Sequence, residues 1–329
     1  MLEKLLEVKE LQVQFERNDT IVKAVNGISF DVYKKEIVGI VGESGSGKSV
    51  CVKALMGLIP KSGKIVSGSA TFMGYDLLSL TAKEQQSIRG KDIGFIFQDP
   101  MSSLNPTLPI GKQIMEPILW HKLTGRSAAK EHTIQLLKRV GIPSPELRMK
   151  QYPFEFSGGM RQRAVIAMAI ACSPKLLIAD EPTTALDVTV QAQIMELISS
   201  MRDELGMSVV IITHDFGVAA QYCDRILVMY AGKIVESASI NQFLSAPRHP
   251  YSKALLKSTP VLGVRKSPEP INGTPPNMSD DMQGCAFASR CNHVTSACIA
   301  SPELTGVGDN HYAACWNMDK EGDDNAATA

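Results

Sequence analysis

The 329-residue sequence lacks a long apolar run, an excess of charge of one sign and any internal repeat. The longest apolar stretch, residues 164–179, is interrupted by Ser173, Pro174 and Lys175. It therefore falls short of the roughly 18 apolar residues that a membrane-spanning helix needs. Charged residues in the first ten positions deprive the N-terminus of the apolar core of an export signal. We expect a chain that is soluble or reaches a membrane only through partners.

The charge balance also limits the class of partner. The sequence has 34 Lys and Arg against 34 Asp and Glu, for a formal net charge of zero. Because nucleic-acid binders usually carry a basic excess, this balance disfavours nucleic acid as a partner. A chain of 329 residues exceeds the usual size of one hydrophobic core, so at least two domains are expected.

The hydrophobic pattern changes along the chain. Polar and apolar residues alternate over the first 30 positions, which predicts half-buried antiparallel strands. Short apolar strands are then expected at residues 36–41, 92–97, 175–180 and 207–214, alternating with helical segments. This alternation indicates a parallel α/β sheet, and amphipathic runs between residues 111 and 172 predict an inserted helical subdomain.

The sequence GESGSGKS at residues 42–49 fits the pattern G-x-x-x-x-G-K-[ST] between a predicted strand and a predicted helix. A chain of this length would match by chance roughly once in a hundred. Its glycines let backbone N–H groups surround a phosphate, and Lys48 is expected to reach the β and γ phosphates of ATP. Ser49 is expected to ligate Mg²⁺ through its hydroxyl. The expected ATP-binding residues of this phosphate loop are Gly42, Ser44, Gly45, Ser46, Gly47, Lys48, Ser49 and Val50.

A second motif, LLIADEP at residues 176–182, is a predicted buried strand that ends in two carboxylates. Asp180 can hold Mg²⁺ through water, and Glu181 can orient or deprotonate the attacking water. Solvated acids at a strand end would be an equal alternative for this motif alone, and the phosphate loop favours the catalytic interpretation. The sequence FSGGMRQR at residues 156–163 opens another predicted helix whose N-terminus can bind an anion.

These motifs, followed by TTALD at residues 183–187 and ITHD at residues 212–215, occur in the order found in the ATPase subunits of ABC transporters. The chain resembles that family over about residues 5–258. The resemblance implies a P-loop NTPase (RecA-like) α/β core with an N-terminal antiparallel β subdomain and an inserted α-helical subdomain. It also implies ATP and Mg²⁺ as ligands.

The resemblance assigns further roles in the ATP site. Gln98 matches the residue that senses the γ-phosphate and Mg²⁺, so Ser49, Gln98 and Asp180 form the expected Mg²⁺ set. His214 matches the residue that contacts the γ-phosphate. Asp187 matches the residue that communicates across a dimer. Phe15 matches the aromatic residue that stacks on adenine, with packing into the core as the alternative.

The same resemblance implies that two subunits pair head to tail, with each ATP between one phosphate loop and the other subunit's signature. The signature residues here are Ser157, Gly158, Gly159 and Met160. Where the family commonly reads Leu-Ser-Gly-Gly-Gln, this chain has Phe156 and Met160 at the two ends. The central Ser-Gly-Gly is intact, so the site is expected to remain competent.

Residues 97–111, 248–260 and 311–315, with the pair Arg290 and Cys291, resemble the oligopeptide/dipeptide importer branch. That branch implies a second, non-identical ATPase, two permeases and an extracytoplasmic binding protein as partners, at the cytoplasmic face of the cell membrane. Relatives that import nickel chelates or oligosaccharides leave those cargoes open, because an ATPase subunit does not touch the cargo. More distant alternatives are a non-transport ABC ATPase and a nucleotide-switched module with little turnover.

We expect an ATPase domain at residues 1–258, with its helical subdomain at about 111–172, a Pro-rich linker at 259–283 and a Cys-rich C-terminal module at 284–329. The module contains Cys285, Cys291, Cys298 and Cys315, separated by five, six and sixteen residues. Disulfides are disfavoured in the cytosol, and the two tight knuckles typical of zinc are absent. Because some transporters of the resembled branch carry a [4Fe–4S] cluster here, we predict a cluster, with zinc and free thiols as alternatives. Cys51, Cys172 and Cys223 are given no role.

Overall fold

The computed structural model describes residues 3–17, 20–184, 186–259, 269–280 and 282–317. The chain folds into two compact units. The first unit consists mainly of residues 76–212, with short pieces near the N-terminus and at residues 32–37. The second unit contains residues 7–31, 38–75 and the described residues beyond 212.

The first unit is built on a parallel sheet in the order β8-β7-β6. Its strands are β6 (Ile93–Ile96), β7 (Leu176–Asp180) and β8 (Ser208–Thr213). Every residue of β7 and β8 is buried, which explains their continuous apolar sequence, since parallel strands are covered on both faces. The expected strands at residues 92–97, 175–180 and 207–214 are therefore confirmed.

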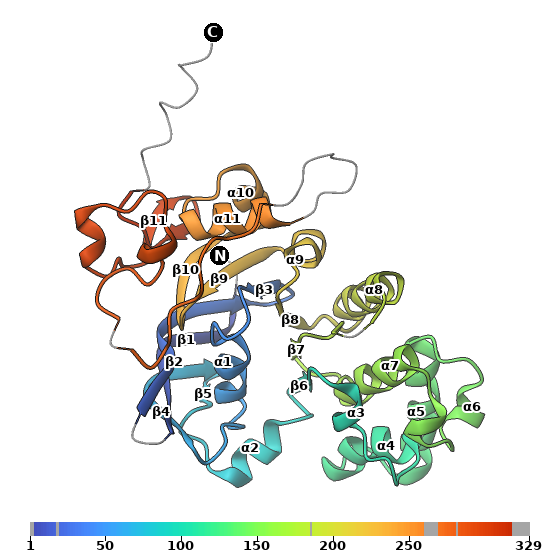
Figure 1. Cartoon of the computed structure of the whole chain (residues 1–329). Helices are drawn as coiled ribbons and strands as arrows, with labels where there is room; N and C mark the ends of the chain where they lie inside the picture. Colours follow the sequence, from blue (N-terminus) through green and yellow to red (C-terminus); the bar gives the residue numbers. More distant parts are fainter. Residues whose placement is uncertain (1–2, 18–19, 185, 260–268, 281, 318–329) are drawn as a thin grey trace. The chain divides into compact units, whose positions relative to one another are not determined.

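Helices make up the rest of the first unit. They are α2 (Ala82–Ile88), α3 (Pro100–Ser103), α4 (Ile110–Trp120), α5 (Arg126–Arg139), α6 (Pro145–Arg148), the 3₁₀ helix η1 (Pro153–Glu155), α7 (Gly158–Ala169) and α8 (Val188–Leu205). Figure 1 shows α4, α5 and α7 gathered into one cluster, and each packs on the other two. Their buried apolar residues recur at helical spacing, as the amphipathic sequence predicted.

The second unit contains a sheet in the order β2-β1-β4-β5. Its strands are β1 (Lys4–Arg17), β2 (Thr20–Tyr33), β4 (Gly63–Phe72) and β5 (Tyr75–Asp76). Only two residues separate β1 from its neighbour β2 in the sequence, a connection that antiparallel strands alone permit. The antiparallel β subdomain expected from the alternating pattern is confirmed.

A further group of strands in the second unit runs in the order β11-β12-β10-β9-β3. These are β3 (Ile37–Val41), β9 (Arg225–Tyr230), β10 (Lys233–Ser239), β11 (Thr305–Gly308) and β12 (His311–Ala313). β3 pairs with β9 in parallel, and the other pairs are antiparallel. The sequence predicted β3, whereas the strands β9 to β12 were missed.

Helices of the second unit flank these strands. They are α1 (Lys48–Leu55), α9 (Phe216–Tyr222), α10 (Ile240–Ser245), α11 (Pro250–Ser258) and the 3₁₀ helices η2 (Ala288–Arg290) and η3 (Ser296–Ile299). The C-terminal module, of which residues 284–317 are described, joins the sheet through β12 and β11, drawn in red in Figure 1. The overall α/β fold is as expected, while the domain boundaries drawn from the sequence remain a prediction.

Candidate nucleotide-binding site

The phosphate loop connects β3 to α1 in the second unit. Gly42, Gly45 and Gly47 have φ values of 154°, 79° and 99°, a backbone range that favours glycine. A Cβ atom at Gly42 would lie 2.1 Å from the Met229 carbonyl oxygen, and one at Gly47 would lie 2.1 Å from that of Ala24. A Cβ atom at Gly45 would have no heavy atom within 4 Å. Two glycines therefore allow close packing, and the third leaves open the space that a phosphate needs.

Lys48 lies under this loop with 4% of its surface exposed. Its ammonium group donates to the carbonyl oxygens of Gly42 at 2.7 Å and Glu43 at 2.9 Å. The Ser44 and Gly45 backbone forms the exposed rim of the loop, and Ser49 and Val50 lie half-buried in the first turn of α1. A buried cation beneath exposed N–H groups at a helix N-terminus is a site suited to a phosphate chain.

The acidic pair lies at the end of β7 in the first unit. Asp180 is fully buried. Glu181 adopts φ = 49° and donates its N–H to the Ile212 carbonyl at 3.0 Å. Its carboxylate accepts hydrogen bonds from the Gln98 amide at 3.0 Å and the Thr184 hydroxyl at 2.8 Å. A left-handed backbone at a non-glycine residue costs about 1–3 kcal/mol and is common at functional sites. The structure thus brings Gln98 and Glu181 together, and Thr184 is a contact that the sequence analysis missed.

The signature begins α7 in the first unit. The Ser157 hydroxyl caps this helix by accepting the Met160 N–H at 3.3 Å, and both Ser157 and Gly158 are exposed. A Cβ atom at Gly159 would lie 3.2 Å from a methyl group of Val190. Asp187 caps α8 by accepting the Val190 N–H at 3.0 Å. Asp187 and Gly159 of the signature therefore both lie next to Val190.

The signature's unusual end residues have separate environments. Phe156 is 2% exposed and so packs in the core of its unit, as a leucine would. Met160 is half-buried in the first turn of α7. The departure from the common signature therefore leaves the exposed Ser-Gly backbone in place.

The two remaining expected site residues lie in the second unit. His214 is exposed in the turn between β8 and α9, where Asp215 caps α9 by accepting the Val218 N–H at 3.3 Å. Phe15 is half-buried on β1, and a Cβ atom at Gly63 would lie 2.6 Å from its ring. Contact with the β4 backbone accounts for the position of Phe15, and its stacking on adenine remains a prediction.

The metal cluster predicted at the C-terminal cysteines is wrong. Among residues 284–317 and the other described parts of the chain, no three His, Cys, Asp or Glu side chains are placed to hold a metal ion. All seven cysteines are free thiols. Burial raises the pKa of Cys285, Cys291 and Cys315, with a further increase from the neighbouring cysteines, so these thiols are protonated at neutral pH. The residues fit neither a [4Fe–4S] cluster nor zinc.

The cysteines given no role are buried or half-buried. Burial raises the pKa of Cys51 and Cys223 to about 12 and that of Cys172 to about 11. Such thiols stay protonated at neutral pH and behave as small apolar side chains.

One contact of the phosphate loop that the sequence does not predict involves Glu43, the second residue of the loop. Its carboxylate pairs with Arg290 of the C-terminal module, 247 positions later in the chain. Its N–H donates to the Tyr251 hydroxyl at 2.9 Å. Nothing in the local sequence pattern indicates either contact.

The fold and the site define an ABC-type ATPase. The family model "ABC transporter" matches residues 25–184, and the model "Oligopeptide/dipeptide transporter, C-terminal region" matches residues 235–298. No helix in the described part of the chain has the length and apolar character needed to span a membrane. The chain belongs to the family of ATP-binding subunits of peptide ABC transporters.

Named relatives support that assignment over nearly the whole chain. The chain is 49% identical to the dipeptide transport ATP-binding protein DppD of Bacillus subtilis, over 97% of this chain and 96% of the relative. It is 50% identical to the oligopeptide transport ATP-binding protein OppD of the same organism, over 95% and 88%. A solved dimeric ATP-binding cassette in a post-hydrolysis state with ADP and Pi matches with a TM-score of 0.65 and 27% identity, over 71% of this chain and 98% of that chain.

Proposed function

We propose that the chain binds and hydrolyses ATP to power a multi-subunit importer of di- or oligopeptides. The observation that carries this proposal is the near full-length similarity to proteins named as dipeptide and oligopeptide transport ATP-binding proteins. The phosphate loop with its buried lysine supports it independently, since that arrangement suits a nucleotide triphosphate.

Within this function, each site residue has a proposed task. Lys48 neutralises the β and γ phosphates, the phosphate-loop backbone of residues 42–50 holds them, and Phe15 stacks on the adenine. Glu181 orients or deprotonates the attacking water, Gln98 senses the γ-phosphate and Mg²⁺, and His214 contacts the γ-phosphate. Ser49, Gln98 and Asp180 offer the hard oxygen ligands that Mg²⁺ prefers, and that ion would neutralise charge that develops on the phosphates.

The proposed assembly contains a second, non-identical ATPase, two permeases and an extracytoplasmic binding protein, with this chain at the cytoplasmic face of the membrane. In that assembly the signature acts on the ATP held by the partner ATPase, through Ser157, Gly158, Gly159 and Met160. Asp187 communicates between the two ATPases. The exposed start of α7 supports this arrangement, because a helix N-terminus is a ready anion site.

The test is ATP turnover by the purified chain and by the assembled transporter in lipid. Turnover should be slow for the chain alone and rise when all partners and a peptide-loaded binding protein are present. Lys48→Ala should weaken ATP binding by roughly 100-fold, because charge-assisted contacts with the phosphates are lost. Lys53→Ala, on the same helix α1, is the matched control and should bind ATP normally.

Two results would contradict the proposal. Full activity of the isolated chain as a homodimer would remove the need for the partners. Stimulation by a binding protein loaded with a nickel chelate or an oligosaccharide, and not by peptide, would assign a different cargo to the same ATPase.

A further inference from the structure

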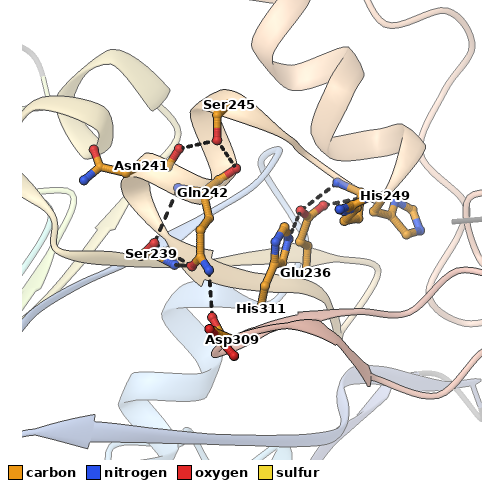
Figure 2. A network of polar contacts seen from close by, with 9 residues as sticks. Glu236, Ser239, Asn241, Gln242, Ser245, His249, Asp309 and His311 are labelled. Carbon is orange, nitrogen blue, oxygen red and sulfur yellow. Dashed lines mark hydrogen bonds and ion pairs between the residues drawn. The ribbon is translucent and has the colours of Figure 1, made fainter. Parts of the chain in front are cut away.

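Within the second unit, a buried polar network docks the C-terminal module on strand β10 and on the residues just before α11. Strand β12 pairs with β10 in the register Glu236 with Ala313 and Ser237 with Tyr312. Figure 2 shows Glu236 between His249 and His311. The Glu236 carboxylate, fully buried, accepts the N–H groups of Arg248 at 2.8 Å and His249 at 2.7 Å. The His311 Nε2–H donates to the same carboxylate at 2.8 Å.

A second connection extends this docking. Gln242 donates from its side-chain amide to the Asp309 carbonyl at 2.7 Å (Figure 2). A buried charge whose lone pairs are filled by fixed donors holds a single geometry, because any shift leaves it desolvated without partners. The module is therefore positioned accurately relative to β10.

This docking places Arg290, the last residue of η2, against the phosphate loop. Its two terminal nitrogens pair with the two carboxylate oxygens of Glu43 at 2.7 Å and 2.9 Å. Only 3% of the Arg290 side chain and 26% of the Glu43 side chain are exposed. A two-pronged pair of this kind fixes orientation as well as charge, and burial protects it from screening by salt.

The other edges of the Arg290 guanidinium group are also filled. Its Nε–H donates to the Asn272 carbonyl at 2.9 Å, and a terminal N–H donates to the Ile271 carbonyl at 3.4 Å. The guanidinium carbon lies 5.8 Å and 5.9 Å from the ring centroids of Tyr230 and Phe287. These hydrogen bonds and ring contacts hold the guanidinium group in one position, which distinguishes the pair from a chance surface contact.

Glu43 is itself part of the geometry of the phosphate loop. Its N–H donates to the Tyr251 hydroxyl at 2.9 Å. Its carbonyl accepts from the Lys48 ammonium at 2.9 Å and the Ser46 N–H at 3.3 Å. A movement of Glu43 would therefore displace both the turn of the loop and the lysine expected to meet the phosphates.

The contact between Arg290 and Glu43 changes the charge next to the phosphate loop. A carboxylate on the phosphate loop lies close to the place where ATP brings several negative charges, and like charges at short range repel strongly in a partly buried site. Arg290 cancels the charge of Glu43 without entering the loop. Without that cation, the loop would carry an uncompensated acid beside its ligand.

We propose that Arg290 is a positioning residue of the nucleotide site, which neutralises Glu43 and fixes the phosphate loop, so that the C-terminal module contributes directly to ATP affinity. This inference rests on the proposed function, in which the loop binds ATP. The module then takes part in ATP binding, and it is also the region that distinguishes this branch of the family.

The test is equilibrium binding of a fluorescent ATP analogue with Mg²⁺ to the full chain, followed by turnover in the assembled transporter. Arg290→Met should raise the dissociation constant roughly tenfold, because Glu43 is left unpaired near the phosphates. KM for ATP should rise in parallel, with little change in kcat. The double variant Glu43→Gln with Arg290→Met leaves no acid beside the phosphates, so it should bind ATP more tightly than Arg290→Met alone.

The controls separate this role from simple docking. Lys233→Met removes another cation that contacts the module, at Ser301, and should bind ATP like the wild type. Should Arg290→Met not fold, Arg290→Lys can replace it in the test. Lysine keeps the positive charge beside Glu43 but loses the two-pronged geometry, so it should weaken binding less than tenfold. Normal binding by Arg290→Met, or a double variant no better than Arg290→Met, would overturn the inference. Failure of the wild type to bind ATP would instead overturn the proposed function.

Discussion

The chain contains two glycine-rich turns that each begin a helix, and their surroundings are opposite. The phosphate loop before α1 is held by its own unit, because Gly232 donates to the Ser46 carbonyl at 3.0 Å and Tyr251 and Arg290 hold Glu43. At the start of α7, Ser157 and Gly158 are exposed, and the cap is supplied by Ser157 itself. Both helix N-termini attract anions and both have an exposed rim, but the phosphate loop is in addition held by residues that are distant in the sequence.

This difference indicates how the binding of one ATP can be divided between two chains. A loop that is held in this way above a buried lysine can bind a triphosphate within one chain. An exposed, self-capped helix start is ready for an anion that another molecule brings. The contrast agrees with the proposed head-to-tail pairing, and the following substitutions and pH change test it.

The largest effect is expected from Glu181→Gln. Glutamine can still accept the hydrogen bonds of Gln98 and Thr184 through its amide oxygen, but it cannot take a proton from water. Turnover by the assembled transporter should fall by roughly 10²- to 10⁴-fold, the usual contribution of a general base. ATP affinity of the chain should stay unchanged, and both are measured by steady-state turnover and equilibrium binding.

The matched control is Glu196→Gln on the exposed face of α8, which should leave turnover and binding as they are. Near-normal turnover of Glu181→Gln would reject its role as the base. A loss of ATP affinity equal to the loss of turnover would show that Glu181 acts on binding and not on the attacking water.

An intermediate effect is expected from Ser157→Ala. The change removes the cap of α7, worth about 1 kcal/mol, and a hydroxyl proposed to meet the partner's phosphate. Turnover in the assembled transporter should fall roughly tenfold, the cost of one hydrogen bond to a charged group. ATP binding by the isolated chain should not change, which is the reverse of the pattern expected for Lys48→Ala.

Ser239→Ala controls for the loss of a cap, because Ser239 caps α10 by accepting the Gln242 N–H at 3.4 Å. Its stability cost should be similar, and its turnover should be normal. If Ser157→Ala weakened ATP binding by the isolated chain, the proposed division of tasks between the phosphate loop and the start of α7 would be wrong.

The sequence predicted features whose cause is local. The phosphate loop, β3 and β7 follow from glycine spacing and from continuous apolar runs over a few residues. Strand β10 was missed because the buried Glu236 interrupts its apolar pattern, and its partner His311 lies 75 positions away. The pair of Glu43 and Arg290 is separated by 247 positions, so no periodicity could reveal it.

The cysteines show a different limit of sequence patterns. The sequence places four cysteines in the C-terminal module, and the resemblance to the importer branch led to the prediction of a cluster. Whether thiols converge on a metal and ionise depends on backbone geometry and burial, which spacing does not encode.

The smallest effect is expected from a change of pH, which alters the stability of the residues that support the phosphate loop. Burial lowers the pKa of His249 to about 3, with a further decrease from Lys253. Its Nδ1 accepts the N–H of Tyr251, whose hydroxyl accepts the N–H of Glu43. The imidazole must therefore be neutral in the folded chain, and protonation would break the bond that orients Tyr251.

Because the folded pKa lies below the unfolded value of 6.5, the unfolded state binds more protons between those two values, and stability is lost as pH falls through them. The free energy of unfolding should decrease by about 1.4 kcal/mol per pH unit, or about 2 kcal/mol between pH 6.5 and pH 5. His249→Asn can accept the same N–H without titrating, and it leaves Glu236 and Lys253 in place. The variant should therefore lack this part of the pH dependence in denaturant melts.

Hydrogen exchange would locate the effect. At pH 5 the wild type should exchange faster than His249→Asn at residues 43–46, while residues 157–160 should exchange alike in both proteins. Equal pH dependence of the two proteins would remove His249 from the support of the loop. Faster exchange at the signature as well would mean that the loop and the helix start share one cooperative unit, and their contrast in stability would be lost.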